Sequence, residues 1–111
     1  MEEKAKKFLI KLEVNEEGKK EIVTYPPRLR VRREKRIKWE CDPDTAGGYY
    51  FVVNLGHNSP HNEETFQAPP GGTITVQIRS DAPFDEYKYT IVLFNTNGEC
   101  FIEDPRFIVR P

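Results

Sequence analysis

The chain has 111 residues and a mass of 13.0 kDa, which fits one domain with a single two-layer core and excludes two such domains. Aromatic residues make up 12% of it and argue against disorder, and no stretch approaches the ~20 apolar residues of a membrane-spanning helix. The N-terminus lacks the apolar segment of a signal peptide, so we expect a cytoplasmic protein whose residues 1–111 form one domain, with residues 1–6 frayed.

Nine prolines and seven glycines separate short apolar runs, a spacing typical of strands joined by frequent turns. Alternation of apolar and polar residues predicts strands, in chain order, at 8–14, 21–25, 29–31, 37–41, 49–55, 73–79, 87–94 and 107–109. The segment 56–72 is expected to be the longest loop, and Asp85 and Glu86 are expected in a turn. Either Tyr87 or Tyr89 is expected to fix a loop through its hydroxyl group.

Four segments together resemble the blue-copper (cupredoxin) family. An aromatic residue, two prolines and an alternating apolar pair at 25–31 are followed by a second pair at 35–39 and by strand-like segments at 72–76 and 87–91. The resemblance extends over roughly residues 25–109. It implies an all-β fold, a Greek-key β-sandwich of about eight strands.

The copper ligands of that family are missing. Blue-copper sites use two histidines, one cysteine and usually an axial methionine. The resemblance places the cysteine and the second histidine near Ile91 and Phe94, and the first histidine near Gly47 or Gly48, while the only methionine is Met1. It therefore implies a sandwich without a copper site, and we expect no cofactor.

Residues 28–38 carry the strongest charge signal, a net +6 in a chain whose total charge is −1. The basic residues are Arg28, Arg30, Arg32, Arg33, Lys35, Arg36 and Lys38. A simple hairpin would set Arg32 opposite Arg36, an arrangement of like charges that needs an anionic partner. In the cupredoxin-like arrangement the chain instead crosses between sheets, and acids such as Glu13 neutralise the divided charges. Nucleic-acid binding through this segment is therefore one alternative function.

Metal binding is a second alternative. His57 and His61 lie in the 56–72 segment and are followed by Glu63 and Glu64. Imidazole and carboxylate groups bind zinc or nickel, so a site here would consist of His57, His61 and one glutamate, with Glu63 the nearer. A solvated polar loop is the simpler interpretation, because Pro60 between the histidines opposes the helix that would align them.

Catalysis has little support, because the chain contains neither a Gly-x-Ser-x-Gly elbow nor a glycine-rich phosphate loop. We therefore expect no enzyme but a non-catalytic binding module that contacts another protein or a second copy of itself. The 56–72 segment or an edge strand is the expected contact surface. Cys41 and Cys100 are either thiols or one disulfide, and their separation in sequence does not decide between these.

Overall fold

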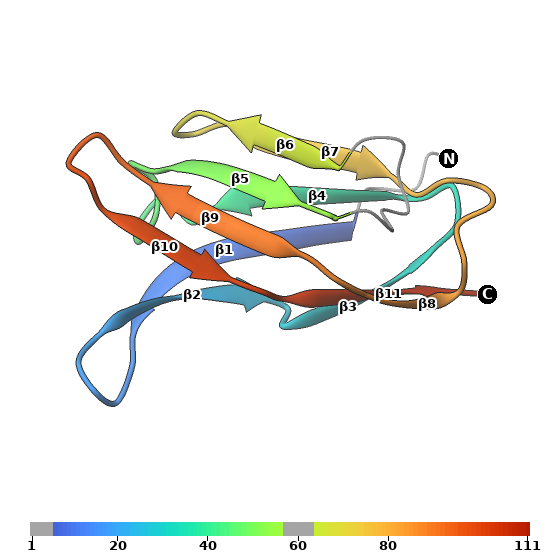
Figure 1. Ribbon diagram of the computed structural model, residues 1–111, viewed down its shortest axis with the longest axis horizontal. Coiled ribbons are helices and arrows are strands. Elements are labelled where there is room, and N and C mark those ends of the chain that lie inside the picture. The colour runs from blue at the N-terminus through green and yellow to red at the C-terminus, as the bar shows by residue number, and fades with distance from the viewer. Residues whose placement is uncertain (1–5, 57–63) are drawn as a thin grey trace.

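The computed structural model describes residues 6–56 and 64–111, and every regular element in these ranges is a β-strand (Figure 1). The strands are β1 Lys6–Val14, β2 Lys20–Tyr25, β3 Arg28–Arg32, β4 Arg36–Cys41, β5 Tyr50–Asn54, β6 Thr65–Ala68, β7 Thr73–Gln77, β8 Asp85–Lys88, β9 Thr90–Phe94, β10 Cys100–Glu103 and β11 Arg106–Arg110. Neither range contains a helix long and apolar enough to cross a membrane. The prediction of an all-β fold is confirmed.

The strands form two layers around one core. One layer is a four-stranded sheet with the order β2-β1-β4-β7. The other contains the sheets β10-β9-β5-β6 and β3-β11-β8, because β8 continues into β9 and β10 into β11 (Figure 1). Buried side chains of all three sheets belong to a single hydrophobic cluster. The molecule is therefore sandwich-like, with extents of 41 × 27 × 26 Å.

The expected number of about eight strands is too low, since the described residues form eleven. One expected strand, 87–94, is divided at Tyr89 into β8 and β9, and β6 and β10 form where no strand was expected. Pro26-Pro27 and Pro105 lie between strands, since proline cannot donate to the ladder.

Shorter elements were also misjudged. The segment 56–72 is not entirely loop, because β6 pairs with β5 in antiparallel register. β6 and β10 have four residues each, too few for alternation to identify them. Asp85 and Glu86 lie in β8 and not in a turn. β1 already begins at Lys6, within the terminus that was expected to fray, because this residue pairs with Ile37 of β4.

The basic segment crosses between the layers and does not form a simple hairpin. β3 pairs with β11 in parallel, whereas β4 pairs with β1 and β7 in the opposite layer. Arg32 and Arg36 therefore do not face each other across a hairpin. The turn between them carries the chain from one layer to the other.

An aromatic cluster joins the two layers at the centre of the core. Trp39 of β4 is fully buried, stacks on Phe8 at 5.8 Å between ring centroids and meets Tyr89 edge-on at 5.5 Å. Its indole N–H donates to the Tyr89 hydroxyl at 3.1 Å, which satisfies a polar group that the core would otherwise leave unpaired. Phe107 of β11 completes the cluster. Trp39 and Tyr89 are therefore core residues.

Tyr87 fixes the loop that precedes it, as one of the two tyrosines was expected to do. Its hydroxyl donates to the Pro83 carbonyl at 2.8 Å, and its ring stacks on Phe107 at 5.5 Å. Tyr89 uses its hydroxyl inside the core instead. The loop after β7 is therefore tied to the β8 strand that contributes to the site described below.

Both cysteines are free, so the disulfide alternative is not realised in this structure. Burial, and more weakly the neighbouring Glu40 carboxylate, raises the pKa of the Cys41 thiol to about 12, so roughly one Cys41 in ten thousand is thiolate at pH 8. Cys100 is exposed on β10. We expect iodoacetamide at pH 8 to alkylate Cys100 completely before Cys41 reacts, as peptide mass spectrometry would measure. Equal labelling of the folded protein would contradict the burial of Cys41.

Candidate functional site: a basic pocket beside β3

Arginines cover the outer face of the β3-β11-β8 sheet. In both β3 and β11, apolar residues that face the core alternate with residues that face outward, and most of the outward residues are arginines. Leu29 and Val31 of β3 face the core, so the arginines of that strand face outward. β11 pairs with β3 in parallel register, which sets Arg28 beside Arg106 and Arg32 beside Arg110. Neighbouring strands lie about 4.8 Å apart, so each pair places two positive charges close together on one face.

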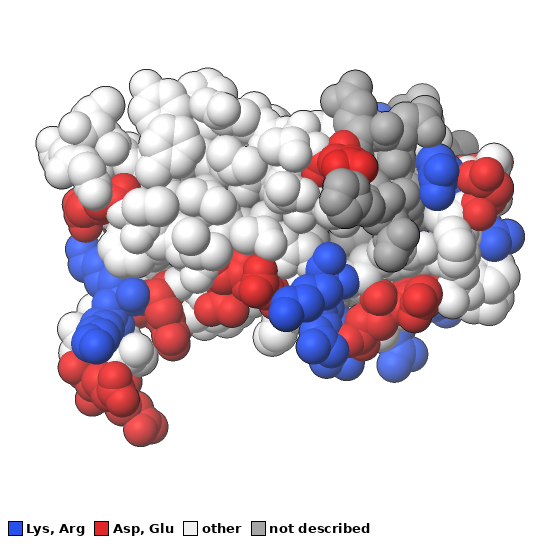
Figure 2. Space-filling model, in the orientation of Figure 1, with Lys and Arg blue, Asp and Glu red and all other residues white. Residues whose placement is uncertain are grey.

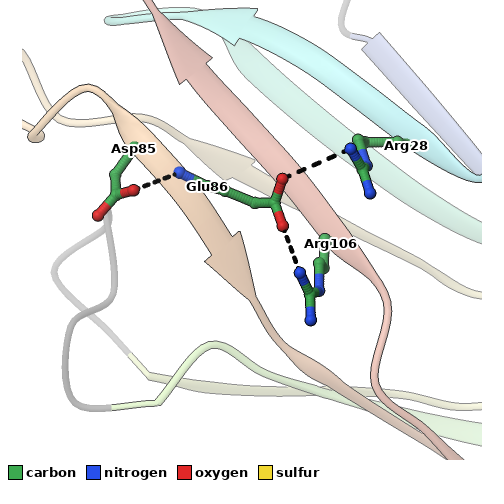
Figure 3. Close-up of polar contacts among 4 residues, drawn as sticks. All are labelled: Arg28, Asp85, Glu86 and Arg106. Atoms are coloured by element: carbon green, nitrogen blue, oxygen red, sulfur yellow. Dashed lines mark hydrogen bonds and ion pairs between the residues drawn. The ribbon is translucent and has the colours of Figure 1, made fainter.

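The first arginine pair is partly neutralised within the chain. Glu86 of β8 accepts from Arg106 at 2.6 Å and lies 3.5 Å from Arg28, so one carboxylate bridges both guanidinium groups (Figure 3). Its backbone N–H donates to the Asp85 carboxylate at 2.8 Å. Glu86 thus shows how an anion resolves the repulsion between paired arginines on this sheet.

The second arginine pair, Arg32 and Arg110, has no such carboxylate among the described residues. Beside it lies a cavity of about 180 Å³. Its lining residues are Lys6, Arg30, Val31, Arg32, Lys35 and Arg110. Five of these six are basic, and no described Asp or Glu lines the cavity. We call it the basic pocket, and its composition makes it an anion-binding site in chemical terms.

Three parts of the chain meet at the basic pocket. β1 begins and β11 ends at the same end of the sandwich (Figure 1), which brings Lys6 and Arg110 together. Arg30 and Arg32 come from β3, the edge strand of its sheet. Lys35 comes from the turn that leads to β4. The pocket therefore depends on the tertiary fold and not on one basic segment.

Backbone hydrogen bonds hold that turn against the end of β7. The Glu34 N–H donates to the Ile78 carbonyl and the Ile78 N–H donates to the Lys35 carbonyl, both at 2.9 Å. Arg33 is also occupied: its Nε donates to the Ala82 carbonyl at 2.7 Å and its guanidinium lies 3.8 Å from the centre of the Phe84 ring. One wall of the pocket is thus fixed before any ligand arrives.

Glu34 adopts the left-handed backbone conformation, with φ at +67°. This conformation is unfavourable for residues other than glycine, and to a lesser degree asparagine or aspartate. Glu34→Gly should therefore raise the free energy of unfolding by about 0.5–1 kcal/mol, after allowing for the greater chain entropy of glycine in the unfolded state. Urea denaturation would measure this, with Glu34→Ala as the variant that removes the charge but keeps the strain. A glycine variant less stable than the alanine variant would contradict the expected result.

The structure places the remaining basic residues of 28–38 elsewhere. Arg36 and Lys38 lie on β4 in the opposite layer, where Lys38 is 3.8 Å from Glu40. Arg28 belongs to the Glu86 bridge. The acid expected to neutralise part of the segment, Glu13, instead accepts from the Tyr25 hydroxyl. The seven residues therefore do not form one continuous surface, and only Arg30, Arg32 and Lys35 line the pocket.

The histidine hypothesis falls on His57, His61 and Glu63, which lie outside the described residues. Within residues 6–56 and 64–111, no group of three or more His, Cys, Asp or Glu side chains is placed to hold a metal ion.

A second surface of the molecule is largely uncharged. Figure 2 shows few charged side chains over β5, β6 and β9, whereas charged groups gather along the lower edge of this view. On the outer face of these strands Tyr50 stacks on Phe94 at 5.2 Å, and Val52 lies beside Val92. Nothing in the described structure indicates what would cover this face, so the basic pocket is the better candidate site.

Sequence reasoning missed Lys6 and Arg110 as pocket residues. Two weak signals were present. Lys6 lies two residues before the buried Phe8 and four before the buried Ile10, so it belongs to the same face of the strand. This is an unusual position for a charged side chain. Arg110 lies four residues after Arg106, a spacing that places both arginines on the same face of a strand. No protein-family model matches this sequence, and a search of curated proteins finds no match either.

Proposed function

We propose that this protein is a non-catalytic binding module, built on a metal-free cupredoxin-like Greek-key sandwich, that holds an anionic group of a protein partner in the basic pocket. The observation that carries the proposal is the contrast between the two arginine pairs of the β3-β11 ladder. Glu86 bridges one pair, and the other borders a cavity lined by basic side chains. An anionic group of a partner supplies, at the second arginine pair, the negative charge that Glu86 supplies at the first pair.

The strand arrangement supports the fold part of the proposal. The chain changes layers between β3 and β4 and again between β4 and β5, as Greek-key sandwiches do. Ile91, near the position of the family's copper-binding cysteine, is a fully buried core residue.

Nucleic-acid binding is the second candidate function. The arginines Arg30, Arg32 and Arg110 are exposed on the outer face of one sheet, where they also suit a phosphodiester backbone. The pocket is confined, however, and Arg28 farther along the same strand is already paired with Glu86. A protein segment that presents one anionic group fits this arrangement better than a continuous backbone.

Fluorescence anisotropy with a labelled hexaglutamate peptide and a labelled oligothymidylate would test the proposed function. We expect the peptide to bind at low salt, and the double variant Arg32→Gln/Arg110→Gln to weaken binding by about tenfold or more. Arg36→Gln/Lys20→Gln is the matched control, because it removes the same charge from exposed residues of the opposite layer. Tighter binding of the oligothymidylate than of the peptide would favour the nucleic-acid candidate. Binding of neither probe, or equal loss in both variants, would contradict a pocket function.

A further inference from the structure

The charge and the number of donors in the basic pocket exceed what one carboxylate can satisfy. At the neighbouring arginine pair, the two oxygens of Glu86 serve two guanidinium groups, one oxygen each. Lys35 already takes part in an interaction of its own, but three arginines, Arg30, Arg32 and Arg110, and the lysine Lys6 also line the pocket. Its ligand therefore needs more acceptor oxygens and more negative charge than a carboxylate carries.

A phosphate monoester meets both requirements. It carries a charge of about −1.5 to −2 at pH 7 and three terminal oxygens that accept strong hydrogen bonds. A phosphodiester has only one negative charge and two such oxygens, and its chain continues in both directions. Arginine matches the oxygens of a phosphate bidentately, whereas lysine acts as a point charge beside it.

The size of the pocket fits one such group. A cavity of about 180 Å³ is smaller than the roughly 300–1,000 Å³ of typical small-molecule sites. This is room for one phosphate head and part of the group attached to it. It is too little for a run of nucleotides, which would need a long groove.

The walls of the pocket are positioned before the ligand binds. Arg30, Arg32 and Arg110 project from paired strands, and the Glu34 backbone hydrogen bond to Ile78 holds the turn that carries Lys35. The backbone positions that carry these side chains are therefore set by the fold, which lowers the entropy that ligand binding costs.

From these observations we infer that the basic pocket recognises a phosphate monoester, the dianionic end group of a phosphorylated side chain or of a small phosphorylated molecule. The inference rests on the proposed function, because it requires that the pocket binds anions. It specifies which anion the pocket prefers.

Isothermal titration calorimetry on the full chain at constant ionic strength tests the preference. The probes are phenyl phosphate as the monoester, diethyl phosphate as the diester, and acetate as the carboxylate. We expect one phenyl phosphate to bind per chain, at least about tenfold more tightly than either other probe, a difference that Arg32→Gln/Arg110→Gln removes and Arg36→Gln/Lys20→Gln retains. Equal affinity for the three probes would overturn the monoester inference and leave the proposed function standing. No binding of any probe would overturn both.

Two further probes distinguish the sources of the phosphate. A short phosphoserine peptide that binds more tightly than phenyl phosphate and inorganic phosphate would support the inference with a phosphorylated polypeptide as the ligand. Equal affinity of all three phosphates would support the inference with a small phosphorylated molecule as the ligand, and would overturn the protein partner of the proposed function. Phosphoserine and serine peptides of equal affinity would contradict the inference, because the pocket would then ignore the phosphate group.

Discussion

Arg110→Glu should abolish anion binding without weakening the fold. The new carboxylate would lie beside Arg32 in the β3-β11 register, as Glu86 lies near Arg28 and Arg106. Replacing an attractive charge by a repulsive one should lower the affinity for phenyl phosphate by about 100-fold or more, since one charge-assisted hydrogen bond contributes about 1.5–3 kcal/mol. The free energy of unfolding should stay equal or rise by about 0.2–1 kcal/mol, because a like-charge pair becomes an opposite-charge pair. Calorimetry and urea denaturation measure the two effects separately.

Arg106→Glu is the matched control, with the same substitution on the same strand and the same face. It would place a carboxylate next to Glu86 and remove the Arg106 ion pair, so we expect the free energy of unfolding to fall by about 0.2–1 kcal/mol. Phenyl phosphate affinity should change by no more than about threefold, since the pocket lining is intact. If both variants lost affinity equally, the protein would attract anions through its general field and not through the pocket.

Trp39→Ala should lower the free energy of unfolding by about 3–5 kcal/mol. Trp39 is fully buried and contacts aromatic residues of both layers, so its loss leaves a cavity where the layers are joined. The Tyr89 hydroxyl would also lose the indole N–H that donates to it. The loss is a large fraction of the 5–15 kcal/mol typical of a domain, so thermal unfolding should shift sharply to lower temperature.

Two further variants separate the contributions to that effect. Tyr89→Phe leaves the Trp39 N–H unpaired in the core and should lower the free energy of unfolding by about 1–3 kcal/mol. Ile102→Ala truncates an apolar strand residue that is 66% exposed, and it should change stability by no more than about 0.5 kcal/mol. A Trp39→Ala variant as stable as Ile102→Ala would contradict the aromatic junction between the layers.

Alternation identified most of the strands because one face of each is buried. Residues 8–12 and 73–77 follow the two-residue period closely, and their inward residues are in the core. Alternation did not identify β6 and β10, because a strand of four residues contains too few periods. Glu86 was assigned to a turn because its strand has only four residues and follows a stretch rich in Asp and Pro.

The candidate site was only partly predictable for a different reason. The charge signal at 28–38 led to Arg30, Arg32 and Lys35, which do line the pocket. Lys6 and Arg110 lie near the opposite ends of the described chain and reach the pocket only because β11 pairs with β3 and β1 lies close by. Sequence patterns do not give such nonlocal pairing. The same pairing also explains why Arg28 is neutralised by Glu86, a partner that the linear charge pattern does not indicate.

The most direct test of the central claim is a nuclear magnetic resonance titration of the isotope-labelled protein with phenyl phosphate, following the arginine Nε–H signals. We predict that the largest shifts occur at Arg30, Arg32 and Arg110 and saturate at one ligand per chain, while Arg28 and Arg106 at the Glu86 bridge change little. Equal shifts at all five arginines, or shifts that do not saturate, would contradict an anion-binding pocket at the second arginine pair.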